Sequence, residues 1–464
     1  MSQHSGGFES NRARKLELQL YAAMSAKILC SAVFVSGRDP EEALQNSVLA
    51  PLRTRPGFQG QPEKAFSKIV TDWDAKAVNV TVKDGPTLTA KYYGDQGCVI
   101  LPQDASGVFF EPVEVETTLP DPMTQDWPMG DAQPDEALPP EVDEEKLKGA
   151  VDAAFANPEA YTAAFLVVYK GRIIAERYGQ GVEKDTQLEC WSMGKSITST
   201  LVGLLVQEGH LGLYDPAPVS EWQLKGDPRA EIRVADLLRM SSGLRFSYLS
   251  DPKEKWEQGV PDHLYVYCGA VDVFQFSINK PPEFPPNTVG RYRNCDPLTL
   301  GYIVKRTVTA MGEEYLSWPQ RALFDRIGIR RQVLETDPYG NFIMTGFDYG
   351  TARNWARIGL LHLWDGVWMG ERLLPEGWVD FVSTPAPAWE EPVYGGLFWV
   401  NGTGRWNLPR NAFYASGAGG QHTFIVPSHD LVVVRMGHRK GGGVCEASTN
   451  EALSKLINAI DAEK

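Results

Sequence analysis

The chain has 464 residues, enough for two or three domains around a large buried core. It is 43% hydrophobic and 22% charged, which is ordinary for a globular protein. The formal net charge of −14 disfavours nucleic acid as a partner, because phosphate backbones are bound by clustered cations. No apolar run reaches the roughly 18–20 residues that a membrane helix needs, so we expect no membrane partner either.

Residues 1–110 are expected to form an accessory α/β region. A helix is predicted over about 12–34, where Lys27 interrupts the most apolar stretch and indicates a helix that packs on the fold. Residues 77–94 alternate like a β-hairpin that turns at residues 84–85. We see no secretory signal with a clean apolar core and a cleavage site. We therefore expect a cytoplasmic protein by default, or a periplasmic or secreted one if a leader was removed.

Residues 111–145 differ in composition from the rest of the chain. They hold twelve acidic residues and seven prolines but no lysine or arginine. Repelling charges and prolines both keep a chain extended, so we expect a solvated linker rather than a binding surface.

Residues 146–464 are expected to form the main domain, with a helical subdomain at approximately 210–345. Strands are predicted at both ends of this domain, in a hairpin over 162–179 and in alternating segments over 413–437. Because strands bracket a helical middle, one sheet should be assembled from both ends. Helices are predicted at 144–156, 191–209, 233–240, 296–310, 351–365 and 447–461.

Cysteine and histidine give little support for a metal site. The six cysteines include no CxxC pair, and the seven histidines show neither HxxxH nor HExxH spacing. The sparse cysteines favour free buried thiols. If one disulfide exists, we expect it to join Cys30 and Cys98 in the N-terminal region.

A serine three residues before a lysine occurs at three places, Ser192/Lys195, Ser250/Lys253 and Ser277/Lys280. The second pair has a proline between its members and charged neighbours, which indicates an exposed turn. In the third pair the lysine precedes two prolines, so no helix continues and no shared dry face is expected. Only the first pair opens a long apolar helix. Its spacing alone also fits a plain helix start, with a small polar cap and a surface lysine.

Ser192 and Lys195 lie one helical turn apart, so their side chains share a face. The helix N-terminus supplies positive potential and free N–H groups, which stabilise an oxyanion and lower the pKa of a nearby lysine. Desolvation lowers that pKa further, so a neutral Lys195 can accept the serine proton. Gly194 is expected to leave open space beside the nucleophile. No GxSxG elbow exists, because Cys190 stands where its first glycine would be. A Ser-His-Asp triad stays open, but nothing in the sequence points to one.

Tyr292 and Asn294 lie in a loop before a helix that we expect Asp296 to cap. A tyrosine here could relay a proton between Ser192, Lys195 and a leaving group, and Asn294 could bond Lys195 or a substrate carbonyl. The alternative is an ordinary turn, since Tyr-x-Asn also occurs at 339–341.

Small residues from Ala415 to Gly420 allow a substrate backbone to approach a strand closely. The N–H of Ala418 could pair with that of Ser192 as an oxyanion hole, with Gly417 and Gly419 in support. The alternative is a glycine-rich hairpin or bulge without a role in chemistry.

In this order the elements resemble the serine β-lactamase and penicillin-binding-protein superfamily, in its class C-like branch. The matching stretches are SMGK at 192–195, YRN at 292–294, LLRMSSGL at 237–244, YGGLFWVNG at 394–402 and the strands from Gly417 onward. The resemblance covers roughly residues 145–460. It implies an α/β (α+β) fold in which an antiparallel sheet flanked by helices lies beside an all-helical subdomain, with the site in the cleft between them. It implies neither a metal nor a cofactor.

The resemblance also implies an acyl-enzyme on Ser192, with Lys195 and Tyr292 as general base and acid. One departure is informative: Ala415-Ser416-Gly417 stands where β-lactamases have Lys-Thr-Gly, whose lysine holds the substrate carboxylate. The pattern is therefore more similar to the esterases and amidases of the family, including the 6-aminohexanoate-dimer hydrolases.

We therefore expect a metal-independent serine hydrolase of the carboxylesterase or amidase type, acting on a small-molecule ester or amide. The alternatives are a β-lactamase or D-amino-acid peptidase of the same fold, or a non-catalytic penicillin-recognising sensor. The N-terminal region and linker either cover the cleft or mediate contacts of a homodimer. Tyr248, Trp256 and Trp399 are candidate pocket residues, although aromatic side chains there are more often core.

Overall fold

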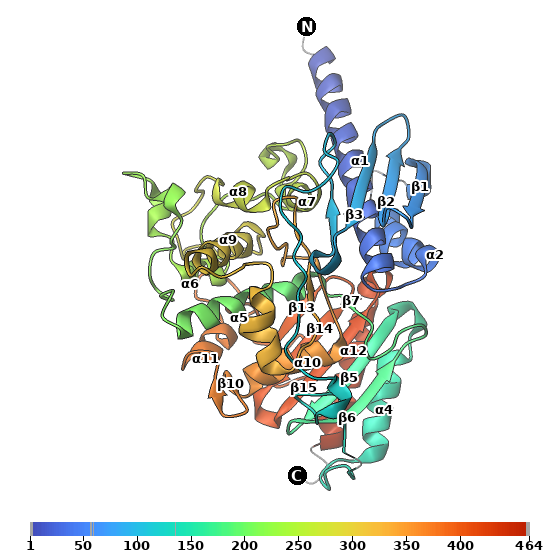
Figure 1. Cartoon of the computed structure of the whole chain (residues 1–464), viewed down its shortest axis with the longest axis vertical. Helices are drawn as coiled ribbons and strands as arrows, with labels where there is room; N and C mark the ends of the chain where they lie inside the picture. The colour runs from blue at the N-terminus through green and yellow to red at the C-terminus, as the bar shows by residue number, and fades with distance from the viewer. Residues whose placement is uncertain (1–2, 56–57, 59, 135, 461–464) are drawn as a thin grey trace.

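The computed structural model describes residues 3–55, 58, 60–134 and 136–460, and its first hundred residues form a layer of their own (Figure 1). In this layer the long helix α1 (Gln3–Phe34) packs on an antiparallel sheet with strand order β1-β2-β3-β4. The predicted hairpin is the central pair of that sheet, while its outer strands went unpredicted. The remaining elements are α2 Pro40–Ala43, α3 Ala50–Arg53, β1 Phe66–Asp72, β2 Ala77–Val82, β3 Thr87–Tyr92 and β4 Cys98–Ile100.

Helix α1 is held to the main domain by one buried charge as well as by apolar contacts. Within it, Arg12–Phe34 is long and apolar enough to cross a membrane by length and composition, contrary to the sequence-based expectation. However, 72% of its most apolar window is buried in the protein.

Lys27 forms an ion pair with Glu335, and both side chains are almost fully buried. Because a lone buried ammonium is costly, this pair fixes how α1 packs on the fold.

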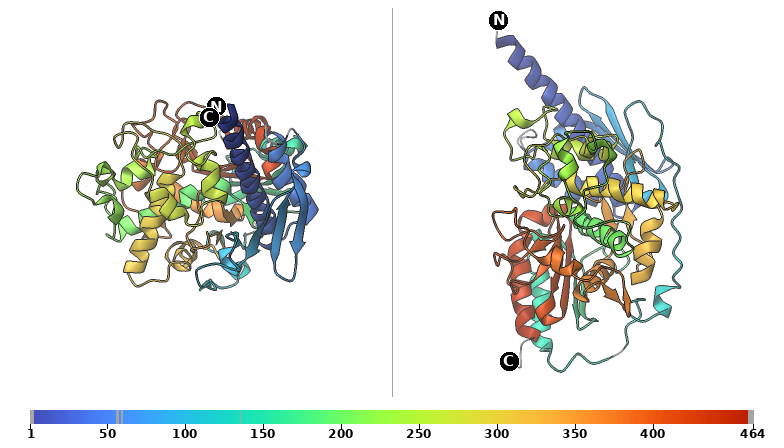
Figure 2. Two further views of the ribbon diagram at one scale, coloured as in Figure 1. Left: turned by 90° about the horizontal axis from the view of Figure 1, so that it is seen from above. Right: turned by 90° about the vertical axis from the view of Figure 1, so that its left-hand side faces the viewer.

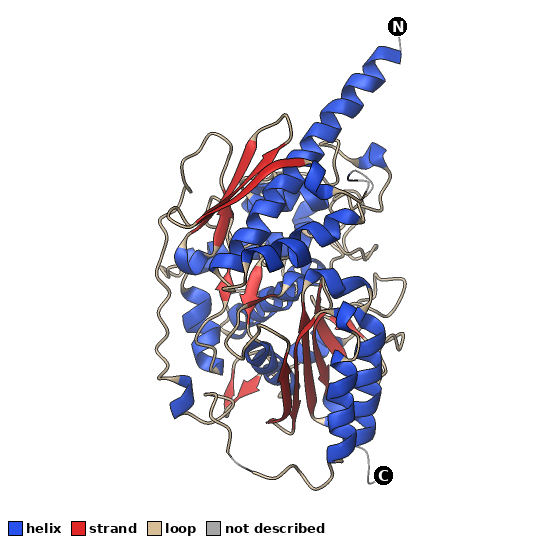
Figure 3. Ribbon diagram, turned by 90° about the vertical axis from the view of Figure 1, so that its right-hand side faces the viewer, coloured by secondary structure: helices blue, strands red, loops and turns tan. Residues whose placement is uncertain are grey.

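The main domain is built on a six-stranded antiparallel sheet in the order β12-β13-β14-β15-β5-β6. β15 pairs with β5, so the sheet joins both ends of the domain as predicted. Both faces are covered, by α4 and α12 side by side on one and by α10 on the other, so β5 is buried along nearly all its length (Figure 3). The bounds are α4 Glu144–Phe155, β5 Thr162–Tyr169, β6 Arg172–Tyr178, α10 Ala352–Leu363, β12 Trp399–Val400, β13 Phe413–Gly417, β14 Gln421–Val426, β15 Leu431–Gly437 and α12 Cys445–Ile460.

Helix α5 (Gly194–Gln207) crosses the middle of the molecule, with the short helices α6 to α9 and their loops on the side away from the six-stranded sheet (Figure 1). All but the last two residues of α5 are buried, which explains the apolar run at this place in the sequence. Further helices are α6 Val234–Leu238, α7 Asp262–Cys268, α8 Val273–Ile278, α9 Cys295–Ala310 and α11 Trp378–Ser383. Small sheets join β7 Leu188–Glu189, β9 Asp348–Gly350 and β8 Val333–Leu334, and β10 Val367–Trp368 with β11 Glu371–Arg372.

The start of α9 differs from its prediction. The helix begins at Cys295 after Asn294, so Asp296 lies inside it and does not cap it. The Asp296 carboxyl instead accepts a 2.6 Å hydrogen bond from the Ser242 hydroxyl and one from the Ser242 backbone. This contact joins the 237–244 segment to the first turn of α9, which directly follows the loop that carries Tyr292. Burial raises the pKa of Asp296 to about 6.

The acidic segment descends along one edge of the molecule from the N-terminal layer to the main domain (Figure 2, right). Most of its residues are solvent-accessible, as expected for a linker. Its middle, however, is docked: Arg357 of α10 donates to the carbonyls of Pro128 and Gly130 and to the Asp131 carboxylate at 2.6–2.7 Å. The prediction of a purely solvated linker is wrong there, because buried arginines of the main domain use these groups as their partners.

The described cysteines are free, and five of the six are buried. Cys30 and Cys98, the pair expected if one disulfide existed, are both free, buried thiols. The structure therefore agrees with the prediction of free thiols.

Candidate active site

Ser192 lies in a 3₁₀ turn, Trp191–Met193, that leads directly into α5. Trp191 has φ +52°, a left-handed backbone conformation that costs a non-glycine residue of order 1–3 kcal/mol and is often found at functional sites. Ser192 is partly exposed, whereas Lys195 in the first turn of α5 is only 1% exposed. Lys195 Nζ lies 3.0 Å from Ser192 Oγ, so the predicted pair is in contact.

The side chains of the other two Ser-x-x-Lys pairs do not contact each other in this way. Ser250 and Lys253 are exposed, as expected. Lys280 and Ser277 are both buried, against expectation, but Lys280 forms a 2.7 Å ion pair with Asp262 and Ser277 donates to a helix carbonyl. Only Lys195 faces the hydroxyl of its own serine in a hydrogen bond.

A backbone carbonyl orients the Lys195 amine. Lys195 Nζ donates to the oxygen of Thr345 at 2.7 Å, and the Tyr267 hydroxyl donates to the same oxygen at 2.6 Å. The Ser192 hydroxyl lies 3.3 Å from it. Neither Tyr267 nor Thr345 was predicted from the sequence. A main-chain acceptor has no residue signature, and Tyr267 has no distinctive spacing from the other site residues.

Burial sets the protonation of the lysine. Desolvation holds the pKa of Lys195 well below its ordinary value, and the nearby Asp348 opposes this shift. Asp348 is fully buried, its two side-chain oxygens have no hydrogen-bond partner among the described residues, and burial raises its pKa to about 8. The prediction that Gly194 leaves open space is wrong, because a Cβ there would meet the Asp348 carboxyl and the Met344 carbonyl. The glycine instead admits these groups beside the helix start.

Tyr292 joins the pair from the loop before α9. Lys195 Nζ lies 5.0 Å from the centroid of the Tyr292 ring, and Tyr292 and Ser192 line the same cavity. The ring stacks on Trp399 at 5.4 Å, so this candidate pocket residue supports the loop of Tyr292 and does not itself line the Ser192 cavity. Burial raises the pKa of Tyr292 above its ordinary value, which keeps its hydroxyl protonated.

Asn294 is buried near the site but reaches other partners than those predicted. Its Nδ2 lies 3.2 Å from Nδ1 of His263. Burial lowers the pKa of His263 to about 3, so this histidine is neutral. Neither Lys195 nor Ser192 has a hydrogen bond to His263 or Asn294 among the described contacts, so the side chains form no Ser-His-Asp triad here. Within the part of the chain that is described, no three His, Cys, Asp or Glu side chains are grouped to hold a metal ion.

The end of β13 packs against the serine turn. A Cβ on Gly417 would overlap the carbonyl oxygen of Cys190, so only glycine allows this approach. Ala418 follows and lines the same cavity as Ser192. Gly419 has φ +89° and packs against the backbone of Arg439, so the turn between β13 and β14 also requires glycine.

Ser192 opens into a cavity of about 200 Å³ that the N-terminal layer helps to enclose. The N-terminal layer thus covers the site, which is one of the two roles expected for it, and its contacts in a homodimer stay a prediction. Tyr248 lines the cavity as predicted and Trp256 does not. The lining residues are Tyr21, Met24, Ser25 and Ile28 of α1; Val48, Pro51, Leu52 and Arg55; Trp191 and Ser192; Tyr248, Leu249, His263, Leu264, Tyr267 and Tyr292; and Ala418 and Arg439.

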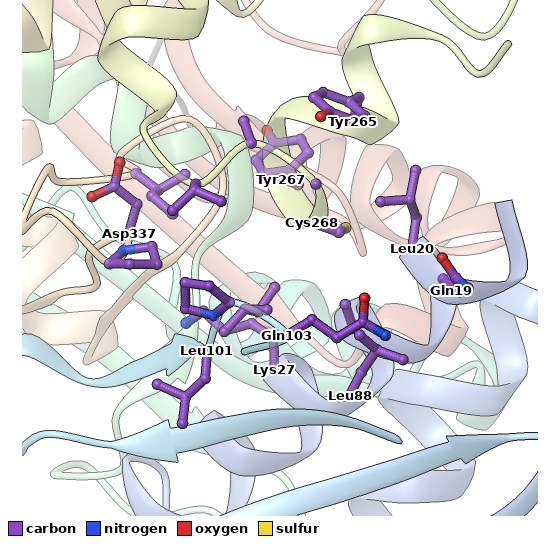
Figure 4. Close-up of a pocket in the computed structure, with 18 of the residues that line it drawn as sticks. Gln19, Leu20, Lys27, Leu88, Leu101, Gln103, Tyr265, Tyr267, Cys268 and Asp337 are labelled. Atoms are coloured by element: carbon purple, nitrogen blue, oxygen red, sulfur yellow. The ribbon is translucent and has the colours of Figure 1, made fainter. Parts of the chain in front are cut away.

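A second cavity of about 220 Å³ lies between α1, β3 and α7 (Figure 4). Its lining includes Leu20, Lys27, Leu88, Tyr265 and Cys268. Tyr267 borders both cavities, but none of the predicted site residues lines this one. Chemistry at Ser192 therefore belongs to the first cavity.

The sequence model of the Beta-lactamase family matches residues 147–456, and the chain belongs to this family of β-lactamase-fold serine hydrolases. A 6-aminohexanoate-dimer hydrolase from Paenarthrobacter ureafaciens is 27% identical over 300 residues, which cover 60% of this chain and 73% of that protein. The predicted family and fold class are thereby confirmed, and this relative is a hydrolase.

Two solved structures share the fold. A family VIII carboxylesterase superposes with a TM-score of 0.52 at 15% identity, covering 69% of this chain and 99% of that one. A penicillin-binding protein homologue from Caulobacter crescentus gives a TM-score of 0.51 at 15% identity, with the same coverage of 69% and 99%.

Proposed function

We propose that the protein is a serine hydrolase that cleaves a small ester or amide through an acyl-enzyme on Ser192. The observation that carries this proposal is a buried Lys195 amine, with a lowered pKa, 3.0 Å from the Ser192 hydroxyl at the wall of a cavity. A solvated lysine would stay protonated at neutral pH and could not accept the serine proton.

In acylation, Ser192 Oγ attacks the substrate carbonyl carbon as its proton passes to the neutral Lys195 amine. The Thr345 carbonyl supports this transfer, because its hydrogen bond fixes the amine and stabilises the lysine once it is charged. The negative charge that forms on the substrate oxygen would be received by the backbone N–H groups of Ser192 and Ala418. Removing one such donor typically costs about 10²–10³ in kcat.

Tyr292 is proposed as the proton donor to the leaving alcohol or amine, replenished from the Lys195 ammonium. Its raised pKa favours this role over that of a base, because the phenol keeps its proton. In deacylation the same groups would act in reverse. Water gives a proton to Lys195 and its oxygen attacks the acyl carbon; the bond from that carbon to Ser192 Oγ then breaks, the acid leaves, and Oγ receives a proton from Tyr292, which the Lys195 ammonium replenishes.

An ester or amide is favoured over a β-lactam by one local feature. Ala415 on β13 stands where the family resemblance places the lysine that holds a β-lactam carboxylate. The relatives named as a 6-aminohexanoate-dimer hydrolase and a carboxylesterase support the same choice.

The test is a turnover panel with wild type and Ser192→Ala. We expect hydrolysis of p-nitrophenyl esters or linear amides, weak hydrolysis of a chromogenic cephalosporin, and loss of all three in the variant. Full esterase activity in Ser192→Ala would refute the proposal. Cephalosporin turnover above that of esters and amides would favour a β-lactamase instead, and a long-lived adduct without turnover would favour a sensor.

A further inference from the structure

The cavity at Ser192 carries positive charge in a chain that is negative as a whole. The net charge is −14, yet none of the described residues lining this cavity is an aspartate or glutamate. Two arginines, Arg55 and Arg439, do line it. His263 is neutral because burial lowers its pKa to about 3, so the arginines supply the charge of this wall.

Arg439 comes from the turn that follows β15 and is partly buried. Its guanidinium lies 5.8 Å from the centroid of the Trp191 ring, directly beside the serine turn. Among the described residues it forms no ion pair and no side-chain hydrogen bond. Glu189 is close enough to influence it but is held by the Ser47 hydroxyl at 3.1 Å.

Arg55 reaches the cavity from the N-terminal layer, two residues beyond α3. It is partly buried and, within the described part of the chain, has no ion pair or side-chain hydrogen bond either. It lies within electrostatic range of Tyr21, Tyr248 and Arg439.

Arg55 and Arg439 lie within electrostatic range of each other, and an anion bound between two like charges relieves their repulsion. Arginine is suited to this task, because its planar fork binds a carboxylate through two parallel hydrogen bonds. Apolar side chains also line this cavity, Met24, Ile28 and Leu52 among them. A cavity of about 200 Å³ with these walls fits a short aliphatic chain that ends in an anion.

We propose that Arg55 and Arg439 bind the carboxylate of the substrate, so that the protein prefers short aliphatic esters or amides that carry a terminal carboxylate. This rests on the proposed hydrolase function and names its substrate class. The lysine of the Lys-Thr-Gly motif is replaced by Ala415. In this chain the cations come instead from the N-terminal layer and from the turn after β15. The N-terminal layer would thus contribute to substrate recognition.

The kinetic test compares three p-nitrophenyl esters with six-carbon acyl groups: hexanoate (neutral), the adipate half-ester (anionic) and 6-aminohexanoate (cationic). Wild type should prefer the adipate half-ester, and Arg55→Gln or Arg439→Gln should reduce its kcat/KM relative to hexanoate by about 10- to 100-fold, mainly through KM. Arg55→Lys, which keeps the charge, should restore part of the preference. Added salt should weaken the preference.

Arg53→Gln is the matched control. Arg53 lies two residues away on α3, is exposed, bonds Gln45 and does not line the cavity. Arg53→Gln changes the net charge by the same amount as Arg55→Gln or Arg439→Gln, so the preference for the adipate half-ester should stay as in wild type. An unchanged preference in both Arg55→Gln and Arg439→Gln, or an equal loss in Arg53→Gln, would overturn the proposal.

A binding test separates this proposal from the hydrolase function. In Ser192→Ala, calorimetry should show hexanoate binding more tightly than hexanamide, and the difference should disappear with Arg55→Gln or Arg439→Gln added. Equal binding of the two probes would refute anion recognition. If the difference is present but wild type hydrolyses none of the esters, the hydrolase proposal fails and the anion site stands.

Discussion

Lys27 in the N-terminal helix and Glu335 in the main domain form an ion pair that is almost completely buried. The same carboxylate accepts hydrogen bonds from the Ser31 hydroxyl and the Cys98 backbone. Through its own backbone, Glu335 bonds Ile343 and Phe347, which flank the carbonyl of Thr345. The N-terminal layer therefore supports the segment that orients the Lys195 amine as well as one wall of the cavity.

Glu335→Gln should destabilise the protein strongly, because it leaves the Lys27 ammonium buried without a counterion. Removing one partner of a buried pair costs about 3–5 kcal/mol, whereas an exposed pair contributes less than about 1 kcal/mol. Urea unfolding followed by fluorescence measures the loss. Glu446→Gln, which breaks the exposed pair with Arg405, is the control, and equal midpoints for the two variants would contradict the inference.

Tyr292→Phe should lower kcat by about 10²- to 10⁴-fold, because it removes a proton donor and keeps the ring. The ring contacts with Lys195 and Trp399 do not need the hydroxyl, so the fold should be unchanged. Tyr394→Phe is the matched control. Tyr394 is a neighbouring buried phenol 6.0 Å from the Tyr292 ring and does not line the cavity. Similar losses in both variants would show that Tyr292 has no special role.

The pH dependence of kcat/KM should show that Lys195 acts as a neutral amine. With a neutral ester, kcat/KM should rise as Lys195 loses its proton and reach a plateau well below pH 10.5, because burial lowers this pKa. The sign follows from the role: a base is active only when deprotonated, so activity is lost as the pH falls. The plateau should persist through pH 9, because Tyr292 keeps its proton. A continuous rise to pH 10, after subtraction of the Ser192→Ala background, would mean that a solvated lysine or a phenolate is the base.

Gly417→Ala should reduce kcat more than it reduces stability. The added methyl would overlap the Cys190 carbonyl, so the end of β13 must move away from the serine turn and carry the Ala418 N–H with it. A loss of about 10² or more is expected if that N–H is an oxyanion donor. Gly149→Ala on α4 is the control, since a Cβ there meets no atom within 4 Å. Unimpaired turnover in Gly417→Ala would show that the Ala418 N–H is not an oxyanion donor.

The site residues that lie within recognisable sequence motifs could be predicted from the sequence. Ser192 and Lys195 share a helix face by local geometry, and Tyr292 followed from its order along the chain and from the family resemblance. The sheet joined from both ends of the main domain was equally predictable, because strand alternation is a local signal.

Other parts of the site depend on long-range packing, which leaves no local pattern. The Thr345 carbonyl belongs to the backbone, and Asp348 reaches Lys195 only because Gly194 admits it. Arg55 lies over a hundred residues from Ser192, in a layer whose position depends on the buried pair of Lys27 and Glu335. Lys27 looked like an interruption of an apolar helix, and its partner is 308 residues away.

The central claim is that Ser192 is the nucleophile, and mass mapping of an acyl adduct tests it most directly. Wild type quenched in acid during turnover of an activated ester should carry the acyl mass on the peptide that contains Ser192, and Ser192→Ala should carry none. Fragmentation should place the mass on Ser192 itself and not on Ser196. An adduct on another residue, or turnover that persists in Ser192→Ala, would contradict the account.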